Sequence, residues 1–429
     1  MLNMRQELLI DRLGPRGEGL ARGERGLVHV PYALPGETVI AEVDGDRGKL
    51  AEVLTPSPDR VAAICPKFGD CGGCAIQTLA MPAYASWKRA ALVDALARES
   101  LTTDIAPLID AHGAGRRRAT FHARFDRDAL GRMRMDVGFM RARAHDIVDL
   151  DACPVLAPEM ANALTAAHAI ARTLSSPLKP LDIVATATLD GLDLDSRGTG
   201  PLSAEMSRAL TRKAEALDLA RLSNHGEIIV ERRAPMLSMG AARINPPPGA
   251  FMQATRAGEE ALAALTMEAI KGAKHVADLF SGVGTFALRL CAVAEVHAVE
   301  TEALSLQALA RAAHNTPGSR KVTTEQRDLF KRPLGGGELA GFDAVVFDPP
   351  RAGAQSQAMA LAASTVPTVV AVSCNVQTFA RDARILVDGG YVFERVTPVD
   401  QFRYSPHLEM VGVFRRPKPK VRKTRRLLG

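Results

Sequence analysis

The strongest constraint on the fold of this chain is an alternation of strand-like and helix-like segments from about residue 245 to residue 414. Helical stretches separate five candidate strands there: "HVADLF", "EVHAVE", "KVTTEQRDL", "FDAVVFDPP" and "PTVVAVSC". Strands that alternate with helices predict a parallel α/β sheet whose ligands bind beyond the carboxyl ends of the strands. Two later runs, "GYVFERVTPVDQF" and "EMVGVFRR", predict a closing antiparallel pair. We therefore expect a Rossmann-like α/β domain over residues 244–414.

The first 58 residues follow a different pattern, in which short alternating runs are separated by turn signals such as Gly14-Pro15 and Pro35-Gly36. Several short strands at this spacing predict a small β-barrel or sandwich over residues 1–58. The stretches "GPRGEGLAR" and "VHVPYALPGETV" resemble a TRAM domain, which is an OB-like RNA-binding barrel. A generic β-domain is the alternative.

Residues 59–243 are less regular and predict a central α+β domain. Apolar residues at helical spacing predict a helix over Tyr84 to Glu99, and "LDIVATATLDGLDLDS" predicts two strands around Asp190-Gly191. A chain of 429 residues accommodates two or three domains. The expected fold is therefore multidomain, with a barrel, a central α+β domain and a Rossmann-like domain.

The overall composition, 47% apolar and 24% charged residues, is that of a globular protein, and no apolar run is long enough to span a bilayer. The first residues, "MLNMRQELLIDRLG", lack the pattern of a secretory signal, which predicts a cytoplasmic protein with no membrane partner. Cysteines in that compartment are reduced, metal-bound or catalytic. We expect a monomer.

Positive charge is concentrated in two stretches. Residues 116–143 hold nine Arg against three Asp, and the tail, residues 415–429, is strongly basic and predicted to be disordered. Such a distribution is typical of a nucleic-acid binding surface, with a solvated face as the alternative. Phe121, Phe125 and Phe139 are interleaved with the arginines and are predicted to stack on RNA bases.

A cluster of cysteines predicts a metal site. Cys65, Cys71 and Cys74 form a C-x5-C-x2-C arrangement around Gly72-Gly73, and Cys153 follows later in the chain. Four thiolates satisfy either a structural zinc ion or a [4Fe–4S] cluster, and the spacing is not that of a zinc ribbon. We favour the cluster and keep zinc as the alternative. With all four ligands supplied by protein, the site is expected to be structural.

The stretch "VADLFSGVGTFALRL" predicts a cofactor pocket, because it places Gly282 and Gly284 between a strand and a helix. The next predicted strand ends in Glu300, at the distance along the chain where a carboxylate accepts the hydroxyls of a ribose. A nicotinamide-dependent dehydrogenase and an S-adenosylmethionine-dependent enzyme both fit this pattern. The rigid loop "DPPRAG" after another strand favours methyl transfer to a planar substrate.

Cys374 in "VSCNVQT" follows an apolar run and by itself predicts a buried thiol more readily than a nucleophile. Together, however, "FMQAT", "DLFSGVGTF", "DPPRAG", "SCNVQT" and "PHLE" resemble the S-adenosylmethionine-dependent RNA (uracil-5-)methyltransferases. The cysteine pattern resembles the iron–sulfur branch of that family, which modifies 23S ribosomal RNA. The tRNA-modifying relatives generally lack both the cluster and the TRAM domain.

The resemblance implies a role for each matching residue. Cys374 would be the nucleophile that adds to C6 of uracil, Glu409 the base that removes the C5 proton, and Asp348 a border of the catalytic pocket. The residues that match family contacts to S-adenosylmethionine are Gln253, Phe280, Thr285, Glu300, Asp328 and Asp348. The implied substrate is a flipped uridine in RNA, with 23S rRNA ahead of tRNA. A non-catalytic RNA-binding or ribosome assembly factor is the alternative from another class.

Four positions depart from the family pattern. Ala371 replaces a usual Tyr, Val376 and Arg403 each replace a usual Pro, and Ser281 stands where Cys is common. None of these removes a reacting group. They bear on which RNA is bound.

Overall fold

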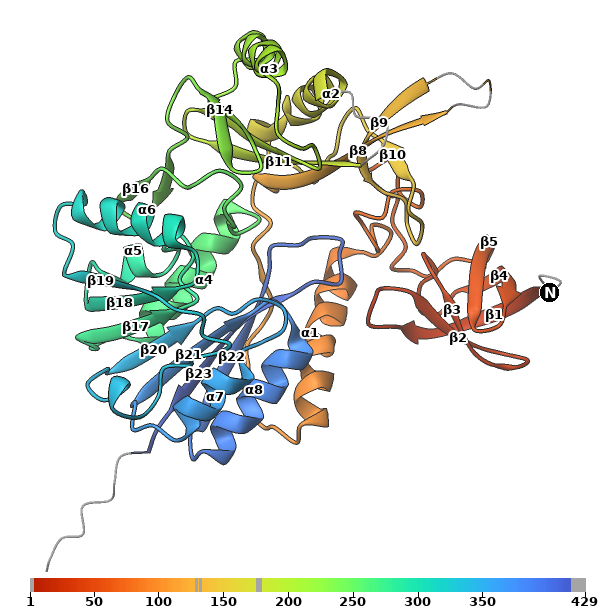
Figure 1. Cartoon of the computed structure of the whole chain (residues 1–429). Coiled ribbons are helices and arrows are strands. Elements are labelled where there is room, and N and C mark those ends of the chain that lie inside the picture. Colours follow the sequence, from red (N-terminus) through yellow and green to blue (C-terminus); the bar gives the residue numbers. More distant parts are fainter. Residues whose placement is uncertain (1–3, 128–129, 131–132, 175–179, 418–429) are drawn as a thin grey trace, which may run out of the picture.

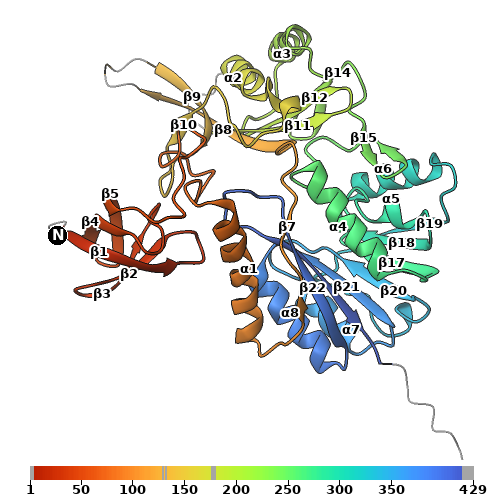
Figure 2. The ribbon, with the colours of Figure 1, turned by 180° about the vertical axis from the view of Figure 1, so that it is seen from behind.

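The computed structural model describes residues 4–127, 130, 133–174 and 180–417, so the predicted tail lies outside it from residue 418 onward. Figure 1 shows a small barrel at one side, a central sheet above, and a larger α/β unit below. Figure 2 shows the same three parts from behind, with α1 (Met81–Arg98) running along the edge of the α/β unit that faces the barrel. Within the described residues, no helix is long and apolar enough to cross a membrane.

The N-terminal strands close into a barrel in the order β1-β2-β3-β5-β4, and β4 pairs with β1. The predicted alternation of polar and apolar residues is the reason: in β4, Val39, Ala41 and Val43 point inward and their neighbours outward. The prediction of a small N-terminal β-barrel is confirmed. Its strands are β1 (Met4–Leu13), β2 (Gly19–Gly23), β3 (Gly26–Val30), β4 (Thr38–Asp44) and β5 (Arg47–Thr55).

The central part is a seven-stranded sheet in the order β10-β9-β8-β11-β12-β13-β14. α2 (Ala163–Leu174) buries an apolar face, including Leu164 and Ile170, against it, and α3 (Ala204–Ala216) joins the same core. The predicted strand pair around Asp190-Gly191 is confirmed. The strands are β8 (Arg118–Arg127), β9 (Met133–Met140), β10 (Ile147–Asp149), β11 (Leu181–Thr188), β12 (Gly191–Arg197), β13 (Arg221–Asn224) and β14 (Glu227–Glu231), with a 3₁₀ turn η1 (Pro158–Met160).

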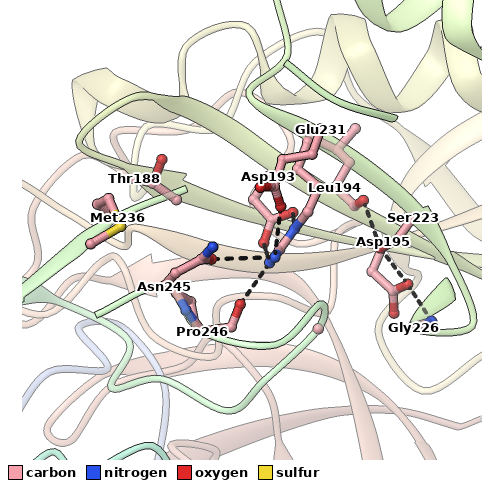
Figure 3. Close-up of polar contacts among 12 residues, drawn as sticks. Thr188, Asp193, Leu194, Asp195, Ser223, Gly226, Glu231, Met236, Asn245 and Pro246 are labelled. Carbon is pink, nitrogen blue, oxygen red and sulfur yellow. Dashed lines mark hydrogen bonds and ion pairs between the residues drawn. The ribbon is translucent and has the colours of Figure 1, made fainter. Parts of the chain in front are cut away.

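A buried polar network fixes the connection from this sheet to the α/β unit (Figure 3). Arg221 makes two hydrogen bonds to Asp193, of 2.9 and 2.7 Å, and donates a third, of 3.0 Å, to the carbonyl oxygen of Pro246. Asn245 Oδ1 lies 3.4 Å from the same guanidinium. The buried charge is thereby paired and hydrogen-bonded, as burial requires. The segment that leads to Phe251 is therefore anchored at its start.

The α/β unit has one sheet in the order β19-β18-β17-β20-β21-β23-β22-β6, with β7 also paired to β22. Five strands run parallel, and β23 enters antiparallel between β21 and β22, which confirms the predicted Rossmann-like fold with a closing antiparallel pair. The strands are β17 (His275–Leu279), β18 (Glu295–Glu300), β19 (Val322–Gln326), β20 (Ala344–Phe347), β21 (Thr368–Ser373), β22 (Val392–Asp400) and β23 (Glu409–Arg415). The helices are α4 (Arg256–Ala269), α5 (Ala287–Leu290), α6 (Ala303–His314), α7 (Gln355–Ala362) and α8 (Val376–Asp388), with a 3₁₀ turn η2 (Gly336–Glu338).

Part of the segment expected in the central domain belongs to this sheet instead. β6 (Asp104–Ile105) and β7 (Ile109–Asp110) pair with the edge strand β22, and apolar residues of α1 share a core with α8. The hairpin β15 (Leu237–Met239) and β16 (Ala242–Ile244) likewise packs into the α/β core. An edge strand offers unpaired backbone groups, and β6 and β7 satisfy those of β22. The expected boundary at residue 244 therefore does not separate two independently packed parts.

Candidate active site

One pocket of about 660 Å³ lies at the carboxyl ends of the central parallel strands. This is the edge where an open α/β sheet binds its ligands. All eight residues predicted for cofactor binding and catalysis line it: Gln253, Phe280, Thr285, Glu300, Asp328, Asp348, Cys374 and Glu409.

The half of the pocket next to β17 and β18 is shaped by a tight backbone turn. Gly282 has a φ of 54° and Phe280 a φ of 60°, in the left-handed region that a bulky residue rarely adopts. Gly282 N donates a 2.9 Å hydrogen bond to Glu300 Oε2, which links the glycine turn to the carboxylate at the end of β18. A Cβ on Gly284 would lie 2.8 Å from Leu309 Cγ, which explains the second glycine.

Asp328 also lines this half, and a second acidic residue, Asp278, is buried behind the lining. Asp328 accepts a 3.0 Å hydrogen bond from Phe330 N, and the Phe330 ring lies 5.4 Å from that of Phe280. Asp278, below the glycine turn, accepts from Ala287 N at 2.9 Å, while its Oδ1 atom has no partner among the described residues. Complete burial raises the pKa of Asp278 to about 8. This carboxyl is therefore held in its neutral form near neutral pH.

The other half of the pocket contains a chain of buried side-chain hydrogen bonds between two carboxyl groups. Gln253 Nε2 donates to Asp348 Oδ2 at 3.2 Å, and Gln401 Nε2 donates to Gln253 Oε1 at 2.6 Å and to Glu409 Oε1 at 3.1 Å. Asp348 directly follows β20, and Glu409 is the first residue of β23. Burial raises the pKa of both carboxyl groups, and the negative charge of Asp348 raises that of Glu409 further.

Cys374 directly follows β21 and is only half-buried. The next residue, Asn375, caps α8, because its Oδ1 accepts hydrogen bonds from Gln377 N at 2.9 Å and Thr378 N at 3.4 Å. Burial, followed by the charges of Glu409 and Asp348, raises the pKa of the thiol to about 11. The thiol is thus neutral in this state of the pocket, while the adjacent helix N-terminus favours negative charge.

Several residues of the pocket carry no assignment from the sequence. Gln401 links the two carboxyl groups, and Phe402 and His407 line the pocket from the loop between β22 and β23. His407 Nε2 lies 3.0 Å from Arg351 Nη2, and burial and that guanidinium lower the pKa of His407 to about 4. The motif "PHLE" contains His407, but a single glutamine such as Gln401 gives no sequence signal.

The loop between β22 and β23 is anchored by side chains of α1. The ammonium group of Lys88 is buried, lies 3.0 Å from Asp400 Oδ1 and also donates to the carbonyl oxygen of His407. Tyr84 OH donates to Asp400 Oδ2 at 2.7 Å and accepts from Tyr404 N at 3.0 Å. Side chains from α1 therefore hold the loop that carries two pocket residues.

The structure accounts for two of the four departures from the family pattern. Val376 occupies the first position of α8, where Pro is favoured but not required. Arg403 pairs with Asp110 of β7. Ala371 lies in the buried core of β21. Ser281 is buried too, and its hydroxyl has no hydrogen-bond partner among the described residues. Nothing in the structure explains these two substitutions.

The four predicted metal ligands, Cys65, Cys71, Cys74 and Cys153, line one cavity of about 100 Å³. Burial raises the pKa of Cys71, Cys74 and Cys153, the last to about 11. Across the part of the chain that the structure describes, no group of three or more His, Cys, Asp or Glu side chains is arranged to hold a metal ion. The structure thus brings the four thiols to one cavity, and the cluster stays a prediction.

The prediction that aromatic residues of the Arg-rich stretch stack on RNA is wrong for Phe121. Its side chain is completely buried and packs against the ring of Phe139 at 5.6 Å. Phe125 and Phe139 also pack against this core, because alternate residues of β8 and β9 face inward. The arginines of this stretch likewise do not all face solvent, because Arg117 is buried and pairs with Glu259 of α4. The rings exposed at the active-site pocket are instead Phe251 and Phe330, at 68% and 49%.

A Rossmann-like sheet with a glycine turn, a strand-end acid and an Asp-Pro-Pro loop defines the class of S-adenosylmethionine-dependent methyltransferases. Residues 247–417 match the family model described as tRNA (Uracil-5-)-methyltransferase. An uncharacterized RNA methyltransferase of Brucella suis is 44% identical over 95% of this chain and 97% of its own length. The chain belongs to the RNA uracil-5 methyltransferase family and is an RNA (uracil-C5)-methyltransferase.

Two further relatives differ in the RNA named for them. The 23S rRNA (uracil(1939)-C(5))-methyltransferase of Chromohalobacter salexigens is 32% identical over 97% of this chain and 90% of its own length. The solved tRNA (uracil-54, C5)-methyltransferase of Pyrococcus abyssi shares the fold, with a TM-score of 0.73, 21% identity, and coverage of 95% of this chain and 99% of its own. A tRNA enzyme therefore has the same architecture from end to end. The expectation that tRNA-modifying relatives generally lack the N-terminal barrel therefore does not hold for this one enzyme.

Proposed function

We propose that this enzyme methylates C5 of a uridine in 23S rRNA through a covalent bond between Cys374 and C6 of uracil. The mechanism rests on one observation. The half-exposed thiol of Cys374, the buried carboxyl groups of Asp348 and Glu409, and the predicted cofactor residues all line one pocket. The rRNA target is supported by the 32% identity to a 23S rRNA enzyme over nearly the whole chain, against 21% to the tRNA enzyme.

The chemistry explains why a thiol and a carboxylate are needed together. When bound, S-adenosylmethionine supplies the methyl group as a sulfonium. Cys374 loses its proton and its thiolate adds to C6, which turns C5 into an enolate carbon that takes the methyl group. Glu409 then accepts the C5 proton, the C5–C6 double bond reforms and the C6–S bond breaks, which regenerates the thiolate.

Features around Glu409 and next to Cys374 favour these steps. Burial raises the pKa of Glu409, which makes its carboxylate a stronger base, and the hydrogen bond from Gln401 to Oε1 orients that carboxylate. Attack by Cys374 requires its thiolate, which the N-terminus of α8 favours. Asp348 and Gln253 would bind the polar end of the cofactor, Glu300 its ribose and Asp328 its base, beside the rings of Phe280 and Phe330.

We also propose that Cys65, Cys71, Cys74 and Cys153 hold a [4Fe–4S] cluster, with zinc as the alternative. The support is that all four thiols line one cavity and that four thiolates are the donor set of such clusters. Bound there, the cluster would join the segment after the barrel to the central sheet. The anaerobically purified protein is expected to be coloured and to contain iron, and a colourless, zinc-containing sample would contradict the cluster.

Trapping with 5-fluorouridine tests the mechanism, because fluorine at C5 cannot leave as a proton and the covalent intermediate accumulates. The wild type with S-adenosylmethionine and 5-fluorouridine RNA should give a protein–RNA adduct that survives denaturation. Cys374→Ala should give none, whereas Cys291→Ala, which changes a cysteine buried in the core, should trap like the wild type. Equal trapping by Cys374→Ala would exclude the mechanism.

The target is tested separately by mapping 5-methyluridine in RNA from a strain that lacks the gene. Loss of one 5-methyluridine from 23S rRNA, restored by the wild-type gene and not by Cys374→Ala, is the expected result. Loss from tRNA with unchanged rRNA would replace the proposed target by tRNA.

A further inference from the structure

A second cavity, of about 190 Å³, adjoins the active-site pocket, and we call it the flanking cavity. Its lining includes Arg116, Arg118, Phe139, Phe251 and Phe402. Phe251 and Phe402 line the active-site pocket as well, so the two spaces share a wall. A water molecule occupies about 30 Å³ in the liquid, so the flanking cavity has room for a group much larger than one water.

We propose that the flanking cavity binds the nucleotide next to the target uridine in the RNA strand. The inference rests on the proposed function, in which the target uridine lies beside Cys374. A flipped base loses its stacking partners, and the strand continues directly from it to the adjacent nucleotide. That nucleotide must therefore lie next to the active-site pocket, and the flanking cavity is the space that shares its aromatic wall.

The first argument is the unsatisfied charge in this cavity. The Nε atoms of Arg116 and Arg118 are both buried, and neither has a hydrogen-bond partner within the described ranges. Within the described part of the chain, the Arg118 side chain makes a long hydrogen bond, of 3.5 Å, from Nη2 to the carbonyl oxygen of Gly249. Buried donors normally find acceptors, and a phosphate or a base carbonyl supplies them to a guanidinium. A nucleotide would supply the missing acceptors; Arg116 lines the cysteine cavity as well, whereas Arg118 lines only the flanking cavity of the two.

The second argument is the aromatic wall. Phe251 is 68% exposed, which leaves its ring free to stack on a base, unlike the buried Phe121. The guanidinium of Arg116 lies over the Phe402 ring, 5.7 Å from its centroid, so the charged and the aromatic sides of the cavity are in contact. One hydrogen bond of 3.0 Å, from Arg221 to the carbonyl oxygen of Pro246, anchors the start of the segment that leads to Phe251.

Binding of short RNAs to the Cys374→Ala variant tests the inference without turnover. The probe is a fluorescein-labelled pentanucleotide with a central uridine, either intact or with an abasic residue directly 5′ or 3′ of that uridine, measured by anisotropy. We expect one of the two abasic RNAs to bind about tenfold more weakly than the intact RNA. Adding Phe251→Ala should reduce that difference to less than about twofold, because the contact is then already lost.

The salt dependence of binding tests the arginines. In the same background, Arg118→Gln should lower the slope of log affinity against log salt by about one, because one phosphate contact is lost. Arg212→Gln, which changes an exposed arginine on α3, should leave the slope unchanged.

Equal binding of all three RNAs would overturn the inference. It would also be overturned if Phe251→Ala and removal of the neighbouring base weakened binding independently, so that their fold-changes in affinity multiplied. Methylation of 23S rRNA by the wild type is a separate measurement. A failure to methylate 23S rRNA would therefore refute the proposed target, even when the coupling between Phe251 and the neighbouring base is still observed.

Discussion

Replacing Gln401 with leucine is expected to change the pH dependence of catalysis. Gln401 is fully buried, and its amide nitrogen lies 3.1 Å from Glu409 Oε1. An N–H donated to a carboxylate stabilises the ionised form, so this hydrogen bond lowers the pKa of Glu409 against the burial that raises it. Without the bond, the pKa of Glu409 rises further.

The magnitude follows from the energy of such a bond. A hydrogen bond to a charged group contributes about 1.5–3 kcal/mol, and one pKa unit corresponds to about 1.4 kcal/mol, so the shift is about one to two units. A base is active only when ionised, so a higher pKa moves the acidic limb of the profile to higher pH. At neutral pH the rate of proton removal should fall about tenfold to a hundredfold.

Release of tritium from RNA containing [5-³H]uridine measures that step directly. The ratio of wild-type to variant rate should approach one as the pH rises above the new pKa of Glu409. Ionisation of Cys374 contributes to the rate of both enzymes, and the charge of Glu409 raises the pKa of the thiol in both. Gln357→Leu is the matched control, because Gln357 is also buried but bonds only to the backbone of Leu334. A loss that is the same at every pH, or an unshifted acidic limb, would refute the reasoning.

Three further results are expected. Burial raises the pKa of Asp278 to about 8, above its unfolded value, so the folded state favours the protonated form and loses stability as the pH rises from about 4 towards 8. Asp278→Asn should therefore melt at increasingly higher temperature than the wild type between pH 5 and 8, and parallel curves would contradict this. Lys88→Met should lower the free energy of unfolding by about 3–5 kcal/mol in urea, because Asp400 is left as an unpaired buried charge; a change within error would contradict it. Cys153→Ser should lose iron and visible absorbance, with Cys291→Ser as the control; equal iron content would argue against the cluster.

The sequence predicts those parts of the site that are local in the chain. The glycine turn at Gly282, the acid at the end of β18 and Cys374 after β21 each lie within one strand–turn–helix unit, where spacing alone sets the geometry. Since parallel strands bring their carboxyl ends to one edge, separate motifs meet in one pocket.

Features that depend on distant contacts could not be predicted in this way. The pairing of β6 and β7 with β22 joins segments about three hundred residues apart, and two-residue strands have no periodicity to detect. Gln401 gains its importance only from the carboxyl groups on either side of it. Phe121, Phe139 and Phe251 are all phenylalanines. The direction of each side chain relative to the sheet decides which ring is exposed, and the residue type does not reveal it.

The position of β23 has a consequence for how the protein is made. Among the residues that the structure describes, β23 is the last strand, yet it lies inside the sheet, between β21 and β22, and its first residue is Glu409. During synthesis, β21 and β22 leave the ribosome with no partner between them until residues 409–415 emerge. Completion of the sheet and arrival of the proposed base are therefore a single late event. A chain truncated before residue 409 should fold incompletely and expose two strand edges, which makes it prone to aggregation rather than partly active.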